Sequence, residues 1–432
     1  MGSMTFNAHA DRILSRRTLL AGFAGSLLAA SPGCNRRARD GSATLWFCYG
    51  GTNREALLAL VDRFHRAQSR HRIEATYQGD YFEGLAKLRM AIAAGVAPTL
   101  THVIGEVVPY LAEAGVLEPL SRFVGLAQLD LVPEVSQARG FVSGDTKPLV
   151  ALPFNRSTPI AIVNGNIFDE CGFHAPRTWD ELRACAQGAT RRANDGLVER
   201  WGFVCPIDWW FWNALVGQAG GQVVSDDGRV TLGDDAGVRA LSFWQTLVHE
   251  DRVMKPPPGR DYNAWQAAHI DFLSGRAAMI WTSTAFLRYL EKNASFPVRA
   301  AALPRDIRFS VSVGGTMFVM PKGAPAREQD SAAAFLYWMM QPEQANEFAM
   351  RTGYIPVSRT GIAQLEKARH FDAHPNDRVA LTQLACAQPW PWTPDLFRIQ
   401  REAVQPRLEQ AVLLRQDAHR VLDEARRALR EG

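Results

Sequence analysis

Apolar residues near the start of the chain occur first in a continuous run and then at helical spacing. Residues 43–48 form a short apolar run that ends at a glycine pair, as is typical of a buried strand. Apolar side chains then recur at helical spacing between residues 57 and 64. Thr52 and Glu55 stand at the separation of a capping box, so we expect Thr52 to cap the start of this helix.

The same alternation continues along the chain. A second strand is predicted over residues 72–77, and a second amphipathic helix carries apolar residues between positions 85 and 92 before it stops at Gly95. Residues 99–104 form a third apolar run. The order strand, helix, strand, helix, strand indicates a parallel sheet with crossover helices, and therefore an α/β fold.

Later segments mix strand-like and helical patterns. Residues 150–164 are strand-like but are interrupted by Pro153 and Pro159, and a mainly helical section follows over residues 179–273. The remaining predicted elements are strands at 277–281 and 315–320, helices at 332–340 and 342–350, and one long helix over 400–430.

Length suggests how many lobes the chain forms, and composition argues against one class of partner. A chain of 432 residues is long for one compact domain, so two lobes are expected. The hydrophobic share of 47% and the net charge of +4 are ordinary for a globular protein. Basic residues cluster near both ends without alternating aromatic residues, so the composition does not support nucleic-acid binding.

The first 34 residues have the pattern of an export signal. Arg16 and Arg17 stand directly before a short apolar run over residues 19–30, which is too short to span a bilayer as a helix. This arrangement predicts a twin-arginine signal, with a generic secretion signal as the alternative. Both interpretations place the mature protein outside the cytoplasm.

The end of the predicted signal also offers a candidate lipidation site. Cys34 follows small residues, as at a lipoprotein cleavage site, although Pro32 departs from the usual pattern. We therefore expect an export signal over residues 1–34, with Cys34 as the candidate acylated residue, and a polar linker over residues 35–42.

Three segments of the chain resemble one family of proteins. They are residues 111–120 (LAEAGVLEPL), 154–159 (FNRSTP) and 352–357 (TGYIPV). These stretches resemble the large, sugar-type (maltose-binding-like) solute-binding proteins of bacterial ABC importers, and in particular members that bind glycerol 3-phosphate and glycerophosphodiesters. The resemblance implies the type II periplasmic-binding-protein fold, with two α/β lobes of discontinuous segments, a hinge and a central ligand cleft.

Segment boundaries follow from the same resemblance. It predicts an N-terminal lobe of residues 43–156 plus 283–325 and a C-terminal lobe of residues 157–282 plus 326–432. The hinge is expected at crossing strands near residues 155–159, 282–284 and 322–327.

Seven residues match the positions at which this family binds a phosphorylated ligand. They are Tyr81, Glu106, Ser157, Ser283, Gly315, Tyr354 and Arg401. The resemblance implies that Glu106 accepts hydrogen bonds from glycerol hydroxyls and that Arg401 binds the phosphate. A phosphate needs several donors and a permanently positive partner, and a guanidinium can donate to two of its oxygens at once. Considered alone, however, Arg401 is equally well a solvated helix residue.

A tryptophan cluster departs from the glycerol 3-phosphate pattern. Trp209, Trp210 and Trp212 are candidate cleft aromatics that could stack on a sugar or polyol. Trp179 is a further candidate, with a core anchor at a helix start as the stronger alternative. Arg156 also differs from the family pattern, and either adds a second cation for the ligand or lines the rim of the cleft.

The expected function is solute capture for an ABC importer. The protein would bind glycerol 3-phosphate or a glycerophosphodiester in the periplasm or at the outer face of the membrane, and deliver it to the permease subunits. We expect a monomer without catalysis, cofactor, metal or nucleic-acid partner. The alternatives are a neutral oligosaccharide binder, an exported hydrolase with Glu106 and Asp80 as paired carboxylates, and a lipoprotein scaffold without a ligand.

Overall fold

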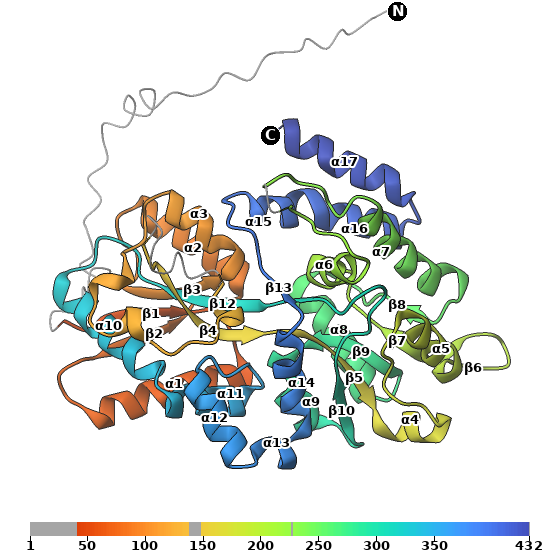
Figure 1. The fold of residues 1–432 in the computed structure, drawn as a ribbon, viewed down its shortest axis with the longest axis horizontal. Helices are drawn as coiled ribbons and strands as arrows, with labels where there is room; N and C mark the ends of the chain where they lie inside the picture. The colour runs from red at the N-terminus through yellow and green to blue at the C-terminus, as the bar shows by residue number, and fades with distance from the viewer. Residues whose placement is uncertain (1–40, 138–147, 226–227, 432) are drawn as a thin grey trace, which may run out of the picture. The chain divides into compact units, whose positions relative to one another are not determined.

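The computed structural model describes residues 41–137, 148–225 and 228–431, which belong to one compact unit (Figure 1). The predicted export signal, Cys34 and residues 35–40 of the predicted linker lie outside the described residues. Within the described ranges, no helix has both the length and the apolar character needed to cross a membrane.

A five-stranded sheet contains the predicted N-terminal strands, in the order β2-β1-β3-β12-β4. β1 pairs in parallel with β2 and β3, whereas β12 runs antiparallel to β3 and β4. The parallel part, with α1 and α2 as its crossover helices, confirms the α/β prediction. The elements are β1 (Ala43–Phe47), β2 (Ile73–Tyr77), β3 (Leu100–Ile104), β4 (Ala151–Ser157), β12 (Gly314–Val319), α1 (Gly51–Ala67) and α2 (Tyr81–Ala93).

A second sheet has the strand order β10-β5-β9-β7-β6, with β8 paired to β7. Its strands are β5 (Pro159–Asn164), β6 (Arg191–Arg192), β7 (Val198–Val204), β8 (Met254–Lys255), β9 (Ala277–Ser283) and β10 (Val298–Ala301). β7 falls inside the section that was predicted to be mainly helical. The section is mainly helical as predicted, but β7 was not foreseen because only residues 202–204 of the strand are buried, which is too short a run to show a strand period.

The remaining elements are mostly helices around the two sheets. They are α3 (Val108–Glu113), α4 (Gly165–Cys171), α5 (Trp179–Ala189), α6 (Trp209–Gln218), α7 (Asp235–Gln245), α8 (Asp261–Leu273), α9 (Leu287–Asn293), α10 (Ala326–Met339), α11 (Pro342–Thr352), α12 (Arg359–Lys367), α13 (His370–Ala373), α14 (Pro375–Leu384), α15 (Leu396–Arg398), α16 (Gln405–Leu413), α17 (Ala418–Glu431), β11 (Val311–Ser312) and β13 (Ala387–Gln388).

The chain passes from one sheet to the other at Thr158. We call the first sheet and the helices packed on it the first lobe, and the second sheet and its helices the second lobe. β4 ends at Ser157 in the first sheet, and β5 begins at Pro159 in the second. Thr158 is fully buried, and its carbonyl oxygen accepts a hydrogen bond from the Thr284 backbone N–H at 3.2 Å. This crossing lies inside the predicted hinge segment 155–159.

Packing differs from the predicted segment boundaries at two places. The buried faces of α10 and α11 share the core of the first lobe with β1, although residues 326–432 were assigned to the C-terminal lobe. Conversely, β10 pairs with β5, and α9 packs beside β9, so both belong to the second lobe rather than the first. The segment 322–327 connects β12 to α10 within the first lobe and is not a crossing.

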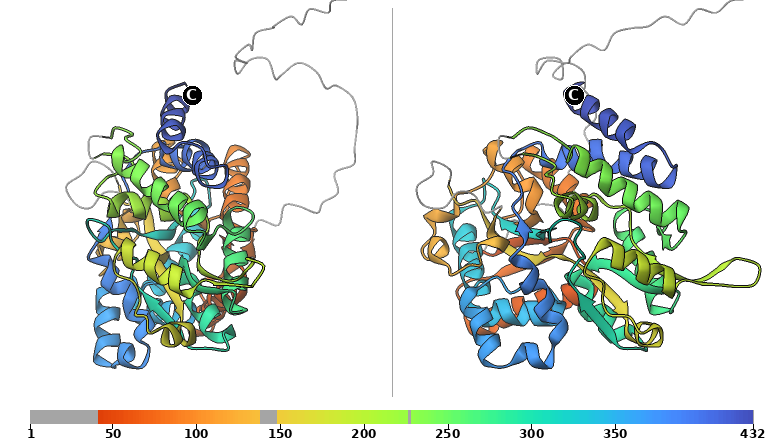
Figure 2. Two further views of the ribbon diagram at one scale, coloured as in Figure 1. Left: turned by 90° about the vertical axis from the view of Figure 1, so that its right-hand side faces the viewer. Right: turned by 45° about the vertical axis from the view of Figure 1, so that its right-hand side comes forward.

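Two predicted helix boundaries were also wrong. α1 begins at Gly51 with Gly50 as the N-cap, so Thr52 lies inside the helix and does not cap it. The long C-terminal helix is divided into α16 and α17, because Arg415 between them has a φ of 55°, in the left-handed region that ends a right-handed helix. Both helices pack against α7 in the second lobe (Figure 2).

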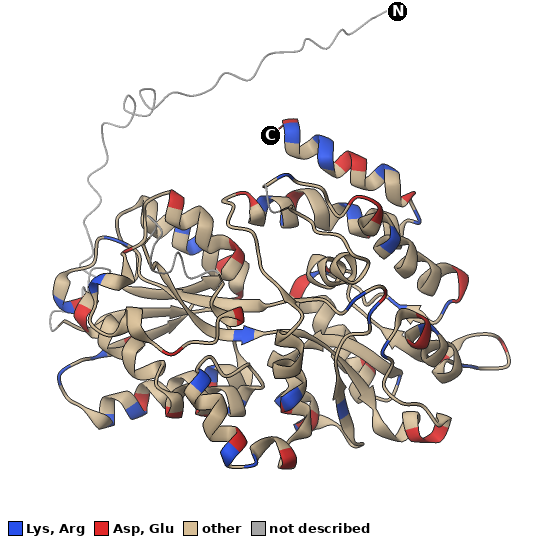
Figure 3. Cartoon of the chain, in the orientation of Figure 1, with Lys and Arg blue, Asp and Glu red and all other residues tan. Residues whose placement is uncertain are grey.

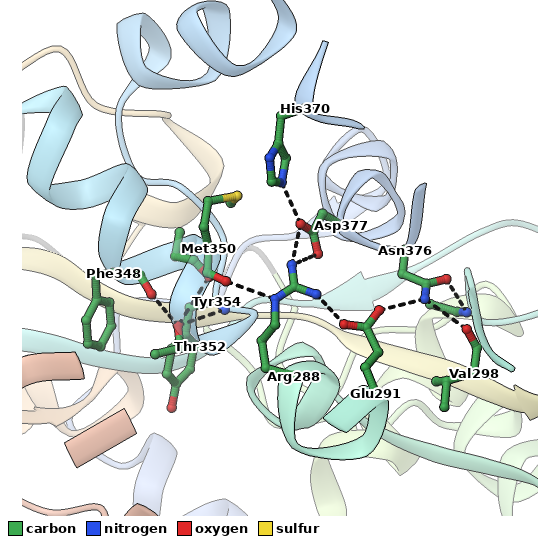
Figure 4. A network of polar contacts seen from close by, with 12 residues as sticks. Arg288, Glu291, Val298, Phe348, Met350, Thr352, Tyr354, His370, Asn376 and Asp377 are labelled. Carbon is green, nitrogen blue, oxygen red and sulfur yellow. Dashed lines mark hydrogen bonds and ion pairs between the residues drawn. The ribbon is translucent and has the colours of Figure 1, made fainter. Parts of the chain in front are cut away.

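A polar network joins helices of both lobes on the side of α9, α11 and α14 (Figure 4). The Arg288 Nε donates to the Met350 carbonyl of α11 at 2.9 Å, and the same guanidinium binds Asp377 and Glu291. His370 Nε2 lies 2.7 Å from the Asp377 carboxylate. Because the Asp377 side chain is only 5% exposed, Arg288 and His370 take the place of the water that would otherwise solvate its carboxylate.

Replacing Arg288 with Ala should lower the free energy of unfolding by about 3 kcal/mol, because it leaves the buried Asp377 carboxylate without its guanidinium. Urea unfolding followed by circular dichroism measures this loss. The matched control is Arg369→Ala, since Arg369 pairs with Asp372 on the surface, where its side chain is 83% exposed. That control should cost less than about 1 kcal/mol. Equal losses in the two variants would contradict the structural role of the network.

Candidate ligand-binding cleft

A cavity of about 350 Å³ lies between the two lobes and is lined by residues of both. From the first lobe come Tyr49, Asn53, Asp80, Tyr81, Phe82, Glu106, Ser157, Gly314, Gly315 and Tyr354, and from the second come Asp208, Trp209, Trp210, Asp261, Tyr262, Trp265, Ser283 and Phe286. Six of the seven residues predicted to bind the ligand therefore line this cavity, and the seventh, Arg401, does not line it.

Strand ends bring four of the predicted residues to this cavity. Glu106 follows the carboxyl end of β3, while Ser157 and Ser283 are the last residues of β4 and β9. Gly315 lies at the amino end of β12, which is the same edge of the sheet because β12 runs antiparallel to β3 and β4. This is the edge at which an open α/β sheet forms a ligand crevice.

Asn155 orients two tyrosine hydroxyls at the wall of the cavity. Its Nδ2 donates to the Tyr81 hydroxyl at 2.9 Å and to the Tyr354 hydroxyl at 3.0 Å, and its Oδ1 accepts from the Thr316 backbone N–H at 3.2 Å. The two hydroxyl oxygens are 3.3 Å apart. Burial raises the pKa of both tyrosines, so both keep their protons. Even if one hydroxyl donates to the other, at least one O–H hydrogen is left for a ligand.

Gly315 allows the backbone to approach closely at the same wall. Its φ of +88° is in the region that favours glycine, and a Cβ at this position would lie 1.9 Å from the Asn155 carbonyl oxygen. A side chain here would therefore disturb the Asn155 arrangement as well as the cavity.

Glu106, which lines the cavity, and Arg156, which does not, are both buried. Burial raises the pKa of Glu106 to about 7, although the positive charge of Arg156 opposes this shift. Arg156 donates from Nη1 to the Gly315 carbonyl at 3.0 Å and is completely buried. It therefore supports the β12 backbone, and neither interpretation offered from the sequence, a second ligand cation or a residue of the cleft rim, is correct.

Arg401 lies beside the cavity and is already paired. Its guanidinium makes a two-point ion pair with Asp261, with the Nη2–Oδ2 distance at 2.8 Å. Its Cζ is 4.0 Å from the ring centroid of Phe82, which belongs to the first lobe. Asp261 and Phe82 both line the cavity, so Arg401 borders the cavity through them.

The four candidate tryptophans divide into two pairs. Trp209 and Trp210 line the cavity. In contrast, Trp212 is buried and donates from Nε1 to the Gly237 carbonyl at 3.3 Å. Trp179 is buried against Phe243, with ring centroids 4.4 Å apart. Trp179 and Trp212 are core residues, as the alternative for Trp179 had stated.

Sequence reasoning located Trp209 and Trp210 but missed the acidic residues and the other aromatic residues that the second lobe contributes. Asp208 caps α6, where its Oδ1 accepts from the Trp210 N–H at 2.8 Å, and its Oδ2 accepts from Trp265 Nε1 at 3.3 Å. An Asp directly before a predicted helix is an N-cap signal that could have located Asp208. Asp261, Trp265 and Tyr262 carry no such signal, because only the folded position of α8 brings them to the cavity.

A family model of bacterial extracellular solute-binding proteins matches residues 59–376 of the chain. The chain belongs to this family. Bacterial extracellular solute-binding proteins of this kind bind small molecules and deliver them to ABC permeases, and their family is not one of enzymes. The two-lobed fold described above is accordingly the type II periplasmic-binding-protein fold.

Individual members of the family are similar over most of their length. The sn-glycerol-3-phosphate-binding periplasmic protein UgpB of Yersinia pestis is 24% identical over 371 residues, which covers 81% of this chain and 82% of UgpB. Among solved structures, UgpB from Mycobacterium tuberculosis in complex with glycerophosphocholine aligns with a TM-score of 0.77 at 20% identity, covering 89% of this chain and 97% of that one. Maltose-bound MalE3 of T. maritima also aligns with a TM-score of 0.77, at 19% identity, covering 90% and 99%.

The raised pKa of Glu106 predicts a specific loss of stability with increasing pH. The unfolded chain releases this proton near pH 4.5, whereas the folded protein keeps it up to about pH 7. The folded state therefore binds more protons across this window, and its stability falls as the pH rises through it. Without ligand, the unfolding free energy of the wild type relative to Glu106→Gln should fall by up to about 3 kcal/mol between pH 4.5 and pH 7.5.

Urea unfolding at a series of pH values measures this difference. Comparison with Glu106→Gln removes the contributions of other titrating groups, because both proteins share them. A difference that stays constant with pH would show that the Glu106 carboxyl ionises normally.

Proposed function

We propose that this solute-binding protein of an ABC importer captures a glycerophosphodiester. The observation that supports this most directly is the convergence of hydroxyl donors from Tyr81, Tyr354, Ser157 and Ser283 on one cavity beside Arg401. These hydroxyls can donate hydrogen bonds to the oxygens of a singly charged phosphate, and the Glu106 carboxylate can accept hydrogen bonds from the hydroxyls of a glycerol group.

Charge favours a diester over glycerol 3-phosphate. Positive and negative residues are interspersed over the helices of both lobes (Figure 3), but every charged residue that the structure places on the cavity wall is acidic. These residues are Asp80, Glu106, Asp208 and Asp261, of which Glu106 contributes only part of a charge near pH 7 because burial raises its pKa to about 7. A phosphate monoester carries about −1.5 to −2 at neutral pH, so it meets stronger repulsion here than a diester with one negative charge or a zwitterion.

The relatives support the same ligand class. UgpB of Yersinia pestis is named for binding sn-glycerol 3-phosphate, and the Mycobacterium tuberculosis structure contains glycerophosphocholine. All seven residue types expected at the ligand positions are present in this chain, and six of them line the cavity.

A neutral oligosaccharide is the second candidate, because the cavity is unusually rich in aromatic rings. Trp209, Trp210, Tyr262, Trp265 and Phe286 all line its second-lobe side. Flat aromatic faces stack on sugar rings, and acidic side chains accept hydrogen bonds from sugar hydroxyls. MalE3 of T. maritima, which has a similar fold, was solved with maltose.

Hydrolysis by Asp80 and Glu106 is poorly supported by the geometry. The Oδ1 of Asp80 accepts from the Phe82 and Glu83 backbone N–H groups at 2.8 and 2.9 Å as the N-cap of α2. These contacts give Asp80 a structural role as a helix cap, which accounts for its position without catalysis. We therefore propose binding without chemistry or cofactor, by a monomer that delivers its solute to permease subunits and has no nucleic-acid partner.

Location is part of the same proposal. We propose that an export signal over residues 1–34 takes the protein to the periplasm or the outer face of the cytoplasmic membrane, and that Cys34 is acylated there. Mass spectrometry of the mature N-terminus purified from its host would show the mass of a diacylglycerol on Cys34, or an unmodified terminus that rejects the anchor.

Calorimetry with glycerophosphocholine, glycerol 3-phosphate and maltose tests the ligand class. Glycerophosphocholine should bind more tightly than the other two ligands and should be recovered unchanged after prolonged incubation. Tighter binding of maltose would favour the oligosaccharide candidate, and release of choline would show hydrolysis.

Replacing Arg401 with Ala should weaken glycerophosphocholine binding by about 2 kcal/mol, roughly thirtyfold, because it removes the cation and leaves Asp261 to repel the phosphate. Titration calorimetry measures this change. Arg398→Ala is the control, since Arg398 lies on the adjoining turn and binds Asp395 and the Leu429 carbonyl instead. Unchanged affinity in Arg401→Ala would remove Arg401 from the binding site.

A further inference from the structure

The Arg401 guanidinium, beside the cavity, is held by a carboxylate that itself lines the cavity. Asp261 contacts Arg401 through both carboxylate oxygens, so the two groups form a fork-to-fork pair. The side chains are 29% and 19% exposed, respectively, so the pair is reached by solvent and by a ligand. An anionic ligand that enters the cavity therefore meets an Arg401 that is already paired with Asp261.

The backbone holds Asp261 in this position. Asp261 is the first residue of α8 and has a φ of 50°, a conformation that few residues other than Gly, Asn and Asp adopt readily. Gly259, two residues earlier, also has a positive φ, of 87°. The ion pair with Arg401 is therefore made from a sharp turn of the backbone at the start of α8.

Phe82 restrains the other partner. The Arg401 guanidinium is 4.0 Å from the centroid of the Phe82 ring, and Phe82 lies on α2 of the first lobe. The face of the guanidinium is thus covered by an aromatic ring from one lobe while its edge is bound by a carboxylate from the other. Its position is therefore fixed before a ligand arrives.

We propose that Asp261 is an internal anion that competes with the ligand phosphate for Arg401 and thereby selects singly charged phosphodiesters over doubly charged phosphate monoesters. This inference rests on the proposed function, because it requires a phosphate beside Arg401. It assigns selectivity to a residue that matches none of the seven expected ligand positions.

The physical reason is that repulsion scales with the ligand charge. A phosphate that approaches Arg401 must share the guanidinium with Asp261 or displace it, and in both cases it lies near a fixed negative charge. A second negative charge on the ligand roughly doubles this repulsion. Asp208, which lines the same side of the cavity, adds to the effect.

The test is the variant Asp261→Asn. Asn has nearly the same shape, tolerates the left-handed backbone and still accepts one hydrogen bond from Arg401, so the fold should be retained. Titration calorimetry at pH 7.5 with glycerol 3-phosphate and with glycerophosphocholine gives two dissociation constants for each protein. We expect the affinity for glycerol 3-phosphate to increase at least about tenfold more than the affinity for glycerophosphocholine.

Two further proteins separate local competition from a general effect of charge. Glu409→Gln removes a nearby negative charge that pairs with Arg260 rather than Arg401, and it should leave the ratio of the two affinities within about twofold of the wild type. In an Arg401→Ala background, Asp261→Asn removes the same negative charge but frees no guanidinium, so the affinity for glycerol 3-phosphate should stay below that of the Asp261→Asn single variant.

An unchanged ratio in Asp261→Asn, or weaker binding of both ligands, would overturn the competition and leave the proposed function intact. An equal shift in Glu409→Gln would likewise reject Asp261 as the selective group. If the wild type binds neither phosphorylated ligand but does bind maltose, the proposed function fails and this inference fails with it.

Discussion

The cleft depends on a single buried residue at which the chain leaves one sheet and enters the other. Thr158 separates β4 from β5, and both strands are buried along their whole length. Its backbone carbonyl binds the start of the turn after β9, and its hydroxyl accepts a hydrogen bond from Gln383 of α14 at 3.1 Å. Since Asn155 and Ser157 are on the same strand, the crossing also sets the positions of the Tyr81–Tyr354 pair and of one cleft serine.

Electrostatics then divides the cleft into two kinds of surface. The first lobe contributes tyrosine hydroxyls held in place by Asn155 together with Asp80 and Glu106, whereas the second contributes Asp208, Asp261 and a wall of aromatic rings. The Arg401 guanidinium at its border is paired with Asp261. A solute that suits both halves has an anionic or hydroxylated part and a part that is apolar, cationic or ring-shaped, as the proposed glycerophosphodiester has.

The family resemblance indicated seven positions, and the six that line the cavity include Glu106, Ser157 and Ser283 at strand ends. Periodic apolar residues located β1, β2 and β3 closely, and each candidate beside such a strand, such as Glu106, proved to line the cavity. Residues that reach the cleft through tertiary packing were not predictable in this way. Trp209 and Trp212 are three positions apart in one helix, yet only Trp209 faces the cavity, and no pattern in that all-apolar stretch shows which side is covered. The division of the C-terminal helix depends on one left-handed residue, Arg415, whose side-chain type does not indicate it.

If a solute hydroxyl donates to Glu106, as proposed, the burial of this carboxyl group also links solute capture to proton exchange. Near neutral pH this carboxyl group is divided between its neutral and charged forms, because burial raises its pKa to about 7. A hydroxyl that donates to it stabilises the charged form, so a proton passes to the solvent when the solute is bound. The heat of binding then includes the heat of protonating the buffer, and it differs between buffers even when the contacts inside the cleft are identical. An importer that works in a compartment of variable acidity would consequently load its solute more readily as its surroundings become less acidic.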